Sequence, residues 1–100
     1  MFGLSIDTVH DLQSIFKQFS NINEVLIFGS RAKGNYKNGA DIDLAIKGQN
    51  ITFDELMDVS LKIDELELLY KVDILNYYQK KNLPIGRHID RVGKSFYKKN

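Results

Sequence analysis

The sequence predicts an α/β sandwich in which one small mixed β-sheet is packed with helices. Apolar residues at helical spacing alternate along the chain with short, dense apolar runs, and Gly, Asn and Pro separate the segments. The chain has 100 residues, 43% of them apolar, which suits one hydrophobic core. We therefore expect a single domain over residues 1–100 with the order αβ, loop, βαβα.

The first predicted element is an amphipathic helix. Apolar side chains recur at steps of three and four residues from Val9 to Phe19. Asp7 or Thr8 is suited to cap its N-terminus, because both side chains accept hydrogen bonds from free backbone N–H groups. The polar pair Ser20 and Asn21 should end the helix.

Two short strands are predicted around a polar loop. Residues 24–28 are dense in Val, Leu, Ile and Phe and stop at Gly29, as expected for a buried strand. A loop rich in Gly, Asn and Lys follows. Residues 41–46 then alternate strictly between polar or small and large apolar side chains. Because strand side chains alternate between faces, Asp41 and Asp43 should share one face.

A longer helix should start after Thr52 and run to about Tyr70. One apolar side of this helix should meet the sheet. Beside it lies a second apolar stripe, for which two interpretations are open: core beneath the first helix, which we favour, or a docking surface for another chain. The second stripe consists of Met57, Leu61 and Leu68.

The last third of the chain predicts a strand, a helix and an extended end. Residues 72–75 form the third strand, which carries Asp73. Asn82 should cap the last helix, with a proline in its first turn, and Gly93 should end it. Residues 94–97 are expected to be extended.

Composition excludes several classes of protein. The chain has no cysteine, which excludes a disulfide scaffold, a thiolate metal site and cysteine nucleophile chemistry. The longest apolar run, residues 25–28, is far below the roughly 18 to 20 residues that span a bilayer. We see no secretory signal at Met1 and expect a cytoplasmic protein without membrane contact.

Charge is unevenly distributed although the formal net charge is only +1. Residues 1–79 carry seven Lys/Arg against twelve Asp/Glu, and residues 80–100 carry seven Lys/Arg against Asp90 alone. We favour a solvated helix face for this basic end, with contact to phosphate or an acidic partner as the alternative. The near-neutral total argues against direct nucleic-acid binding.

The aspartates are the strongest chemical signal. Two carboxylates on one strand face lie only about 7 Å apart and repel each other unless a cation separates them. Mg²⁺ prefers such oxygen ligands, and Asp73 on the next strand would complete a two-ion site. The alternative is a polar sheet edge, or aspartates paired with Arg31, Lys33 or Lys71.

A turn of Gly29 and Ser30 follows the first strand directly. Such a turn can bring backbone N–H groups and a hydroxyl close to phosphate oxygens. Arg31 and Lys33 add cationic side chains beside it. Alone, Gly-Ser is a common turn and a weak signal.

Together these residues resemble a known family. Gly29-Ser30, ten residues, and then Asp41-Ile42-Asp43 resembles the Gly-Ser to Asp-x-Asp motif of the DNA polymerase β-like nucleotidyltransferase superfamily. Asp73 lies where that family places its third carboxylate. The fuller string over residues 29–45, with the closing segment 89–97, is similar to the minimal nucleotidyltransferases known as MntA-type antitoxins.

The resemblance implies a polymerase β palm-like fold and transfer of a nucleoside monophosphate, with ATP as substrate and pyrophosphate as product. Gly29 and Ser30 would hold the triphosphate, with Arg31 and Lys33 as weaker assignments. The catalytic and metal-binding residues would be Asp41, Asp43 and Asp73, holding two Mg²⁺ ions, and Asp73 would also help to deprotonate the acceptor.

The resemblance also implies a partner. A chain this short is expected to lack a platform for nucleic acid or a small acceptor, so the acceptor is expected to belong to a partner protein. The resemblance implies that this partner is a HEPN-domain ribonuclease toxin, modified with AMP on a tyrosine. One alternative is a binding module that silences such a partner by occlusion without catalysis. Another is transfer to RNA or to a small molecule. Homo- or hetero-oligomers are both compatible with the sequence.

Overall fold

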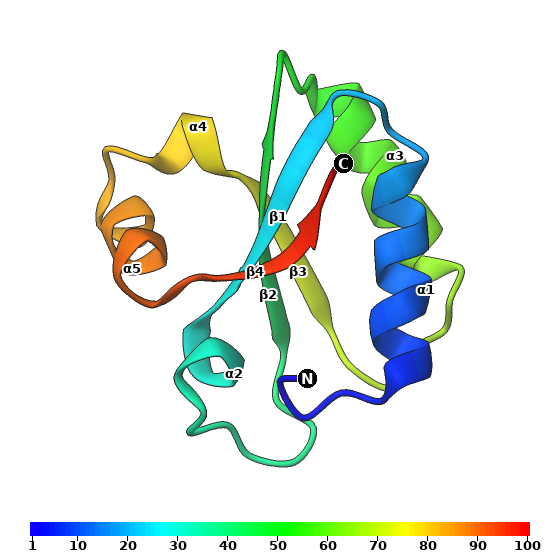
Figure 1. Ribbon diagram of the computed structural model, residues 1–100, viewed down its shortest axis with the longest axis vertical. Helices are drawn as coiled ribbons and strands as arrows, with labels where there is room; N and C mark the ends of the chain where they lie inside the picture. Colours follow the sequence, from blue (N-terminus) through cyan, green and yellow to red (C-terminus); the bar gives the residue numbers. More distant parts are fainter.

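The computed structural model describes residues 1–100 and contains a four-stranded mixed sheet with helices on both faces (Figure 1). The strand order is β3-β2-β1-β4. β1 pairs antiparallel with β2 and with β4, whereas β2 and β3 are parallel. The strands are β1 (Ile22–Phe28), β2 (Ile42–Gly48), β3 (Val72–Asn76) and β4 (Lys94–Lys98).

Five helices cover this sheet. Figure 1 shows α1 and α3 on one side of the strands and α2, α4 and α5 on the other. The predicted α/β class and the extended end are confirmed, whereas the short helices α2 and α4 were not predicted. The helices are α1 (Ile6–Lys17), α2 (Gly29–Lys33), α3 (Phe53–Asp64), α4 (Tyr77–Lys80) and α5 (Pro84–Val92).

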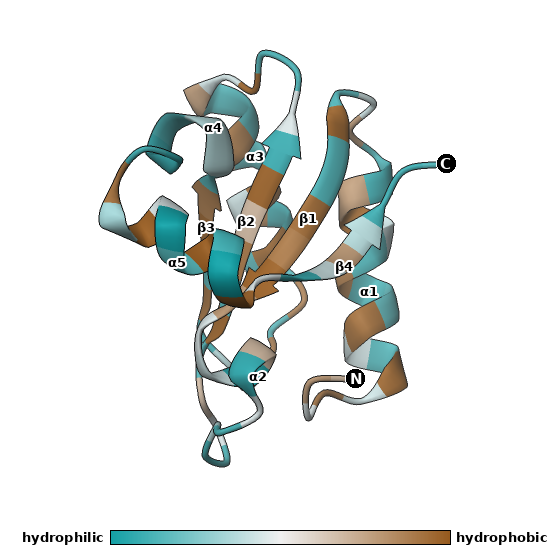
Figure 2. Cartoon of the chain, turned by 60° about the vertical axis from the view of Figure 1, so that its left-hand side comes forward, coloured by the Kyte–Doolittle hydropathy of each residue, from teal (hydrophilic) through white to brown (hydrophobic).

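The central strand β2 has its two faces in two different apolar clusters. Ile42, Leu44 and Ile46 belong to the main core beneath α1 and α3. Ala45 belongs to a smaller cluster with Ile89 of α5 on the opposite face. The predicted alternation of β2 is therefore correct, and Figure 2 shows the hydrophobic stretch along β1 and β2 between the helical layers.

Two predicted helix caps are wrong by a few residues. Ser5, rather than Asp7 or Thr8, caps α1, because its Oγ accepts a hydrogen bond from the backbone N–H of Thr8 at 3.1 Å. At α5 the N-cap position is Leu83, without a side-chain hydrogen bond, and not Asn82. The proline occupies the first helical turn and Gly93 ends α5, as predicted.

Thr52 caps α3 as predicted, in a capping box with Glu55. The helix ends at Asp64, earlier than Tyr70, and Glu67 adopts a left-handed φ of 51° that no helix continues through. The favoured interpretation of the second apolar stripe is wrong at Met57 and Leu61, because both side chains are exposed. None of the five helices is long and apolar enough to cross a membrane.

Candidate active site

Two of the predicted aspartates lie side by side on neighbouring strands. The parallel register pairs Asp43 of β2 with Asp73 of β3, and neighbouring strands are about 4.8 Å apart. Asp43 is half-buried and Asp73 is exposed. Asp41 is exposed and lies immediately before β2. All three carboxylates therefore belong to the end of the sheet where β2 and β3 begin.

The proximity of the three carboxylates affects the pKa of Asp43. Burial raises the pKa of the Asp43 carboxyl above its ordinary value, and the negative charges of Asp73 and Asp41 raise it further. His88 and Lys71 act in the opposite direction. A cation at this site would remove the repulsion that raises the pKa.

Gly29 lies directly against the Asp43 carboxylate. Phe28, the last residue of β1, is the register partner of Asp43, so the chain turns beside it. Gly29 has a φ of 72°, and a Cβ built there would lie 2.6 Å from Asp43 Oδ2. Only glycine fits this position without displacing the carboxylate. Ser30 follows in α2 and is half-buried.

Arg31 was expected to contact the triphosphate, but its guanidinium is a structural group and not a free phosphate ligand. The residue is 3% exposed. Its Nε and Nη2 donate to the carbonyl of Ala40 at 3.1 and 2.8 Å, and its Nη1 donates to the carbonyl of Phe2 at 2.9 Å. The rings of Tyr36 and Tyr70 lie 5.0 and 4.8 Å from its central carbon. These contacts use three of the five N–H donors of the buried guanidinium and place two aromatic rings beside it.

Lys33 remains available, since its side chain is exposed at the end of α2. A second cation, Lys71, lies 3.7 Å from an oxygen of Asp73. Both side chains of this ion pair are largely solvated, so the pair contributes little to stability. It leaves Asp73 accessible to a competing cation.

His88 is a residue of this site that the sequence did not reveal. Its ring packs edge-to-face against Phe28 at a centroid distance of 6.1 Å. From there it lowers the pKa of Asp43. No local signal could have found it, because α5 reaches β1 only through the tertiary fold.

The donor set suits magnesium. No group of three or more His, Asp or Glu side chains is arranged so that it could hold a metal ion, so Asp41, Asp43 and Asp73 do not form a three-carboxylate metal group. Magnesium is rarely caged by protein ligands alone, and it is commonly held by one or two carboxylates together with waters and substrate phosphates. Asp43 and Asp73, adjacent and mutually repelling, provide such an open set of oxygen ligands.

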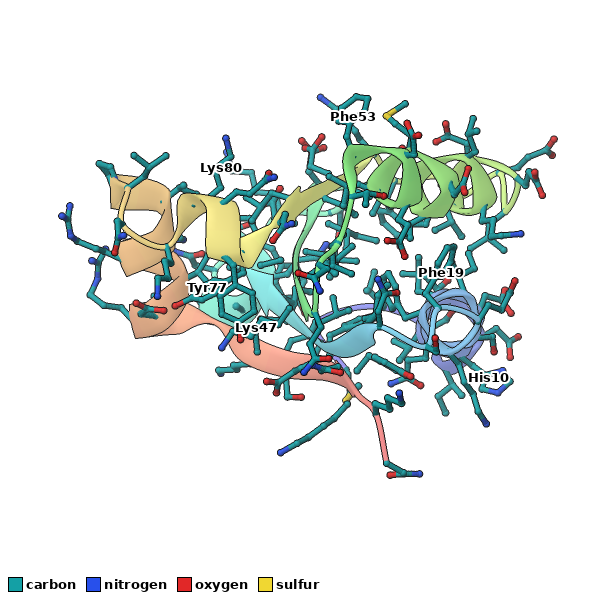
Figure 3. All side chains as sticks on the ribbon, turned by 90° about the horizontal axis from the view of Figure 1, so that it is seen from above. His10, Phe19, Lys47, Phe53, Tyr77 and Lys80 are labelled. Atoms are coloured by element: carbon teal, nitrogen blue, oxygen red, sulfur yellow. The ribbon has the colours of Figure 1, made fainter.

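Two other polar features lie outside this site. The Tyr77 hydroxyl donates to Asp90, a bond that raises the Tyr77 pKa, and Lys47 Nζ lies 4.5 Å from the centre of the same ring (Figure 3). An open groove of about 770 Å³ lies between α1 and β4. Lysines but no Asp or Glu side chains line it, so it does not coincide with the carboxylates.

Comparison with known proteins identifies the family. Residues 10–100 match the family model described as "Polymerase beta, Nucleotidyltransferase". This chain belongs to that family. The resemblance carried by the Gly-Ser and Asp-x-Asp motif is thereby confirmed, and so is the predicted fold. No curated protein matches the sequence significantly.

Several crystal structures share the fold. A toxin–antitoxin with AMP-PNP has a TM-score of 0.69 and 16% identity, covering 97% of this chain and 76% of that chain. A mutant of the toxin–antitoxin MntA-HpeT has a TM-score of 0.66 and 13% identity, covering 97% and 75%. A protein from Sulfolobus solfataricus described as a nucleotidyltransferase has a TM-score of 0.51 and 23% identity, covering 97% and 92%.

Proposed function

We propose that this nucleotidyltransferase-family chain is a magnesium-dependent enzyme that transfers AMP from ATP to a tyrosine hydroxyl of a partner protein. Its partner would be a HEPN-type ribonuclease toxin, which the modification silences. The observation that carries the proposal is the register of Asp43 beside Asp73, with the Gly29 turn against the same carboxylate.

Each candidate residue has a proposed role that follows from its position in the site. Gly29 and Ser30 bind the triphosphate, and the exposed Lys33 neutralises part of its charge. Asp41, Asp43 and Asp73 hold Mg²⁺, which supplies charge neutralisation of the phosphates. Such transfers depend mainly on positioning and on charge stabilisation, so few protein groups are needed.

In the proposed step, the acceptor oxygen attacks the α-phosphorus of ATP. A bond forms between that oxygen and phosphorus, and the bond from the α-phosphorus to the bridging oxygen breaks. Pyrophosphate leaves with the electron pair, and the proton of the acceptor hydroxyl passes to the carboxylate of Asp73. The products are an AMP ester of the partner and pyrophosphate.

The related structures support the nucleotide and the partner. One of them is a toxin–antitoxin crystallised with AMP-PNP, an ATP analogue. The MntA-HpeT mutant carries two aspartate-to-glutamate substitutions two positions apart, the spacing of Asp41 and Asp43. These facts concern those proteins, and they favour the same chemistry and the same class of partner here.

A second candidate function is silencing by occlusion, without transfer. The exposed Met57 and Leu61 on α3 favour it, because large solvent-facing apolar side chains are typical of contact surfaces. In this alternative the aspartates are dispensable for silencing.

One experiment separates the two candidates. The chain is co-expressed with a small HEPN-type ribonuclease, incubated with Mg²⁺ and α-labelled ATP, and the intact mass of both proteins is measured. Transfer predicts one or more AMP masses on the partner, lost in Asp41→Asn and retained in the control Asp11→Asn on the exposed face of α1. A partner that is silenced without gaining an AMP mass would contradict the transfer proposal and support silencing by occlusion.

A further inference from the structure

The outer face of α3 exposes a line of large apolar side chains. Phe53, Met57 and Leu61 follow each other at intervals of four residues and therefore lie along one side of the helix. They are 73%, 43% and 56% exposed. Val59 and Ile63, on the inner side, are buried in the main core. We call the three exposed residues the α3 stripe.

The α3 stripe adjoins α4. Asn76, which caps α4, donates from Nδ2 to the carbonyl of Ile51 just before α3, at 3.4 Å. Figure 3 shows Phe53 and Lys80 projecting from the same side of the molecule. Tyr78 of α4 is also exposed, at 55%. α3 and α4 cover opposite sides of the sheet, and both contact its edge strand β3. At this edge the stripe and the exposed side of α4 form one surface, which we call the α3–α4 face.

The charges on the α3–α4 face are separated. Asp54 and Asp58 are exposed beside the stripe on α3, whereas Lys80 and Lys81 are exposed at the end of α4. None of these four side chains forms a salt bridge within the chain. The face is therefore acidic at α3 and basic at α4, with exposed apolar groups on both helices.

We propose that the α3–α4 face binds the same face of a second copy of this chain, giving a two-fold symmetric dimer. A two-fold rotation places the acidic part of one copy against the basic part of the other, twice, so the face is complementary to itself. The apolar groups are then covered at the contact.

The charge pattern distinguishes this occupant from others. The aspartates beside the stripe repel an anionic membrane surface and a nucleic acid. A different partner would have to place basic groups against α3 and acidic groups against α4. A second copy does so because its own face carries both kinds of group. The proposed dimer leaves α2 and the Gly29 turn free, because α2 and α4 lie at opposite ends of the sheet (Figure 1).

Sedimentation of the purified chain over a wide concentration range tests the dimer. A monomer–dimer equilibrium is expected, and Met57→Glu and Leu61→Glu should each weaken it at least about tenfold. Ile6→Glu is the matched control, because Ile6 is 84% exposed on α1, outside the face. Circular dichroism must show the same helix content in all variants.

Charge reversal makes the test specific to a two-fold contact. The double variants Asp54→Lys/Asp58→Lys and Lys80→Glu/Lys81→Glu should each be monomeric alone, since like charges then meet twice. Mixed together, they should form a heterodimer, because opposite charges meet at both contacts. A wild-type chain that is monomeric at the highest soluble concentration, or a dimer that all four stripe and charge variants leave intact, would overturn the proposal.

Discussion

Among single residues, Asp43 couples stability to chemistry most directly. Its half-buried carboxylate is crowded by Asp73 and Asp41, and these effects together raise its pKa. A site that concentrates negative charge in this way costs the folded chain stability when no cation is bound. The same crowding favours binding of a divalent ion.

Asp43→Asn should reduce AMP transfer by about 10²-fold or more, while the metal-free variant unfolds at a higher temperature than the wild type near neutral pH. Because the folded-state pKa of Asp43 is raised, its contribution to stability is complete below the unfolded pKa and is lost as pH rises through the folded pKa. The wild-type free energy of unfolding should therefore fall over this window, and the variant should lack that part of the fall. Thermal unfolding across pH measures both; parallel curves would contradict the assignment.

Substitutions of the two cationic residues of α2, Arg31 and Lys33, should differ in their effects on stability and on nucleotide binding. Arg31→Ala removes three part-buried hydrogen bonds and two ring contacts of a buried side chain, so it should lower the free energy of unfolding by about 2–4 kcal/mol. Lys33→Ala, at an exposed site, should change it by less than about 0.5 kcal/mol and weaken nucleotide binding instead. Urea denaturation and nucleotide titration of both variants check this division. Equal stability losses would show that it is wrong.

Among the elements, the turn from β1 into α2 combines an unusual backbone conformation with a direct contact to the candidate site. Gly29→Ala combines a left-handed φ with a Cβ contact to Asp43, and should cost about 1–3 kcal/mol and displace the carboxylate. Gly39→Ala is the matched control, because Gly39 also has a positive φ but no atom within 4 Å of its Cβ position. Both variants should lose stability, and only Gly29→Ala should lose Mg²⁺-dependent nucleotide binding. Normal binding by Gly29→Ala would contradict the proposed turn.

Sequence patterns predicted the longer elements well and their ends less well. The strict alternation around Asp43 fixed the faces of β2, because a central strand between two apolar layers leaves few other arrangements. The end of α3 was missed because a left-handed residue, Glu67, terminates the segment without Gly or Pro. α2 and α4 are too short for helical periodicity to identify them.

At the scale of the whole molecule, the site is assembled from segments distant in sequence. The motif predicted Asp41, Asp43 and Asp73, but the register that pairs Asp43 with Asp73 depends on the parallel crossover through α3. Neither the burial of Arg31 nor the exposure of Met57 could be predicted from the sequence, because both depend on which surfaces pack together. Helical spacing alone cannot say whether an apolar side chain meets the core or solvent.

The proposed dimer belongs to the same scale, and it makes one prediction about the site. Because α4 and α2 lie at opposite ends of the sheet (Figure 1), Met57→Glu should weaken the dimer and leave nucleotide affinity within about twofold of the wild type. Calorimetric titration of the monomeric variant measures this. A large loss of affinity would mean that the two regions are coupled.

The proposed binding of a magnesium–nucleotide complex by the carboxylates beside Gly29 can be tested by amide NMR during titration with AMP-PNP. Mg²⁺-dependent shifts are expected at Gly29, Ser30 and Asp73, and they should be absent in Asp43→Asn. Shifts confined to the groove between α1 and β4, or binding that needs neither Mg²⁺ nor Asp43, would contradict it.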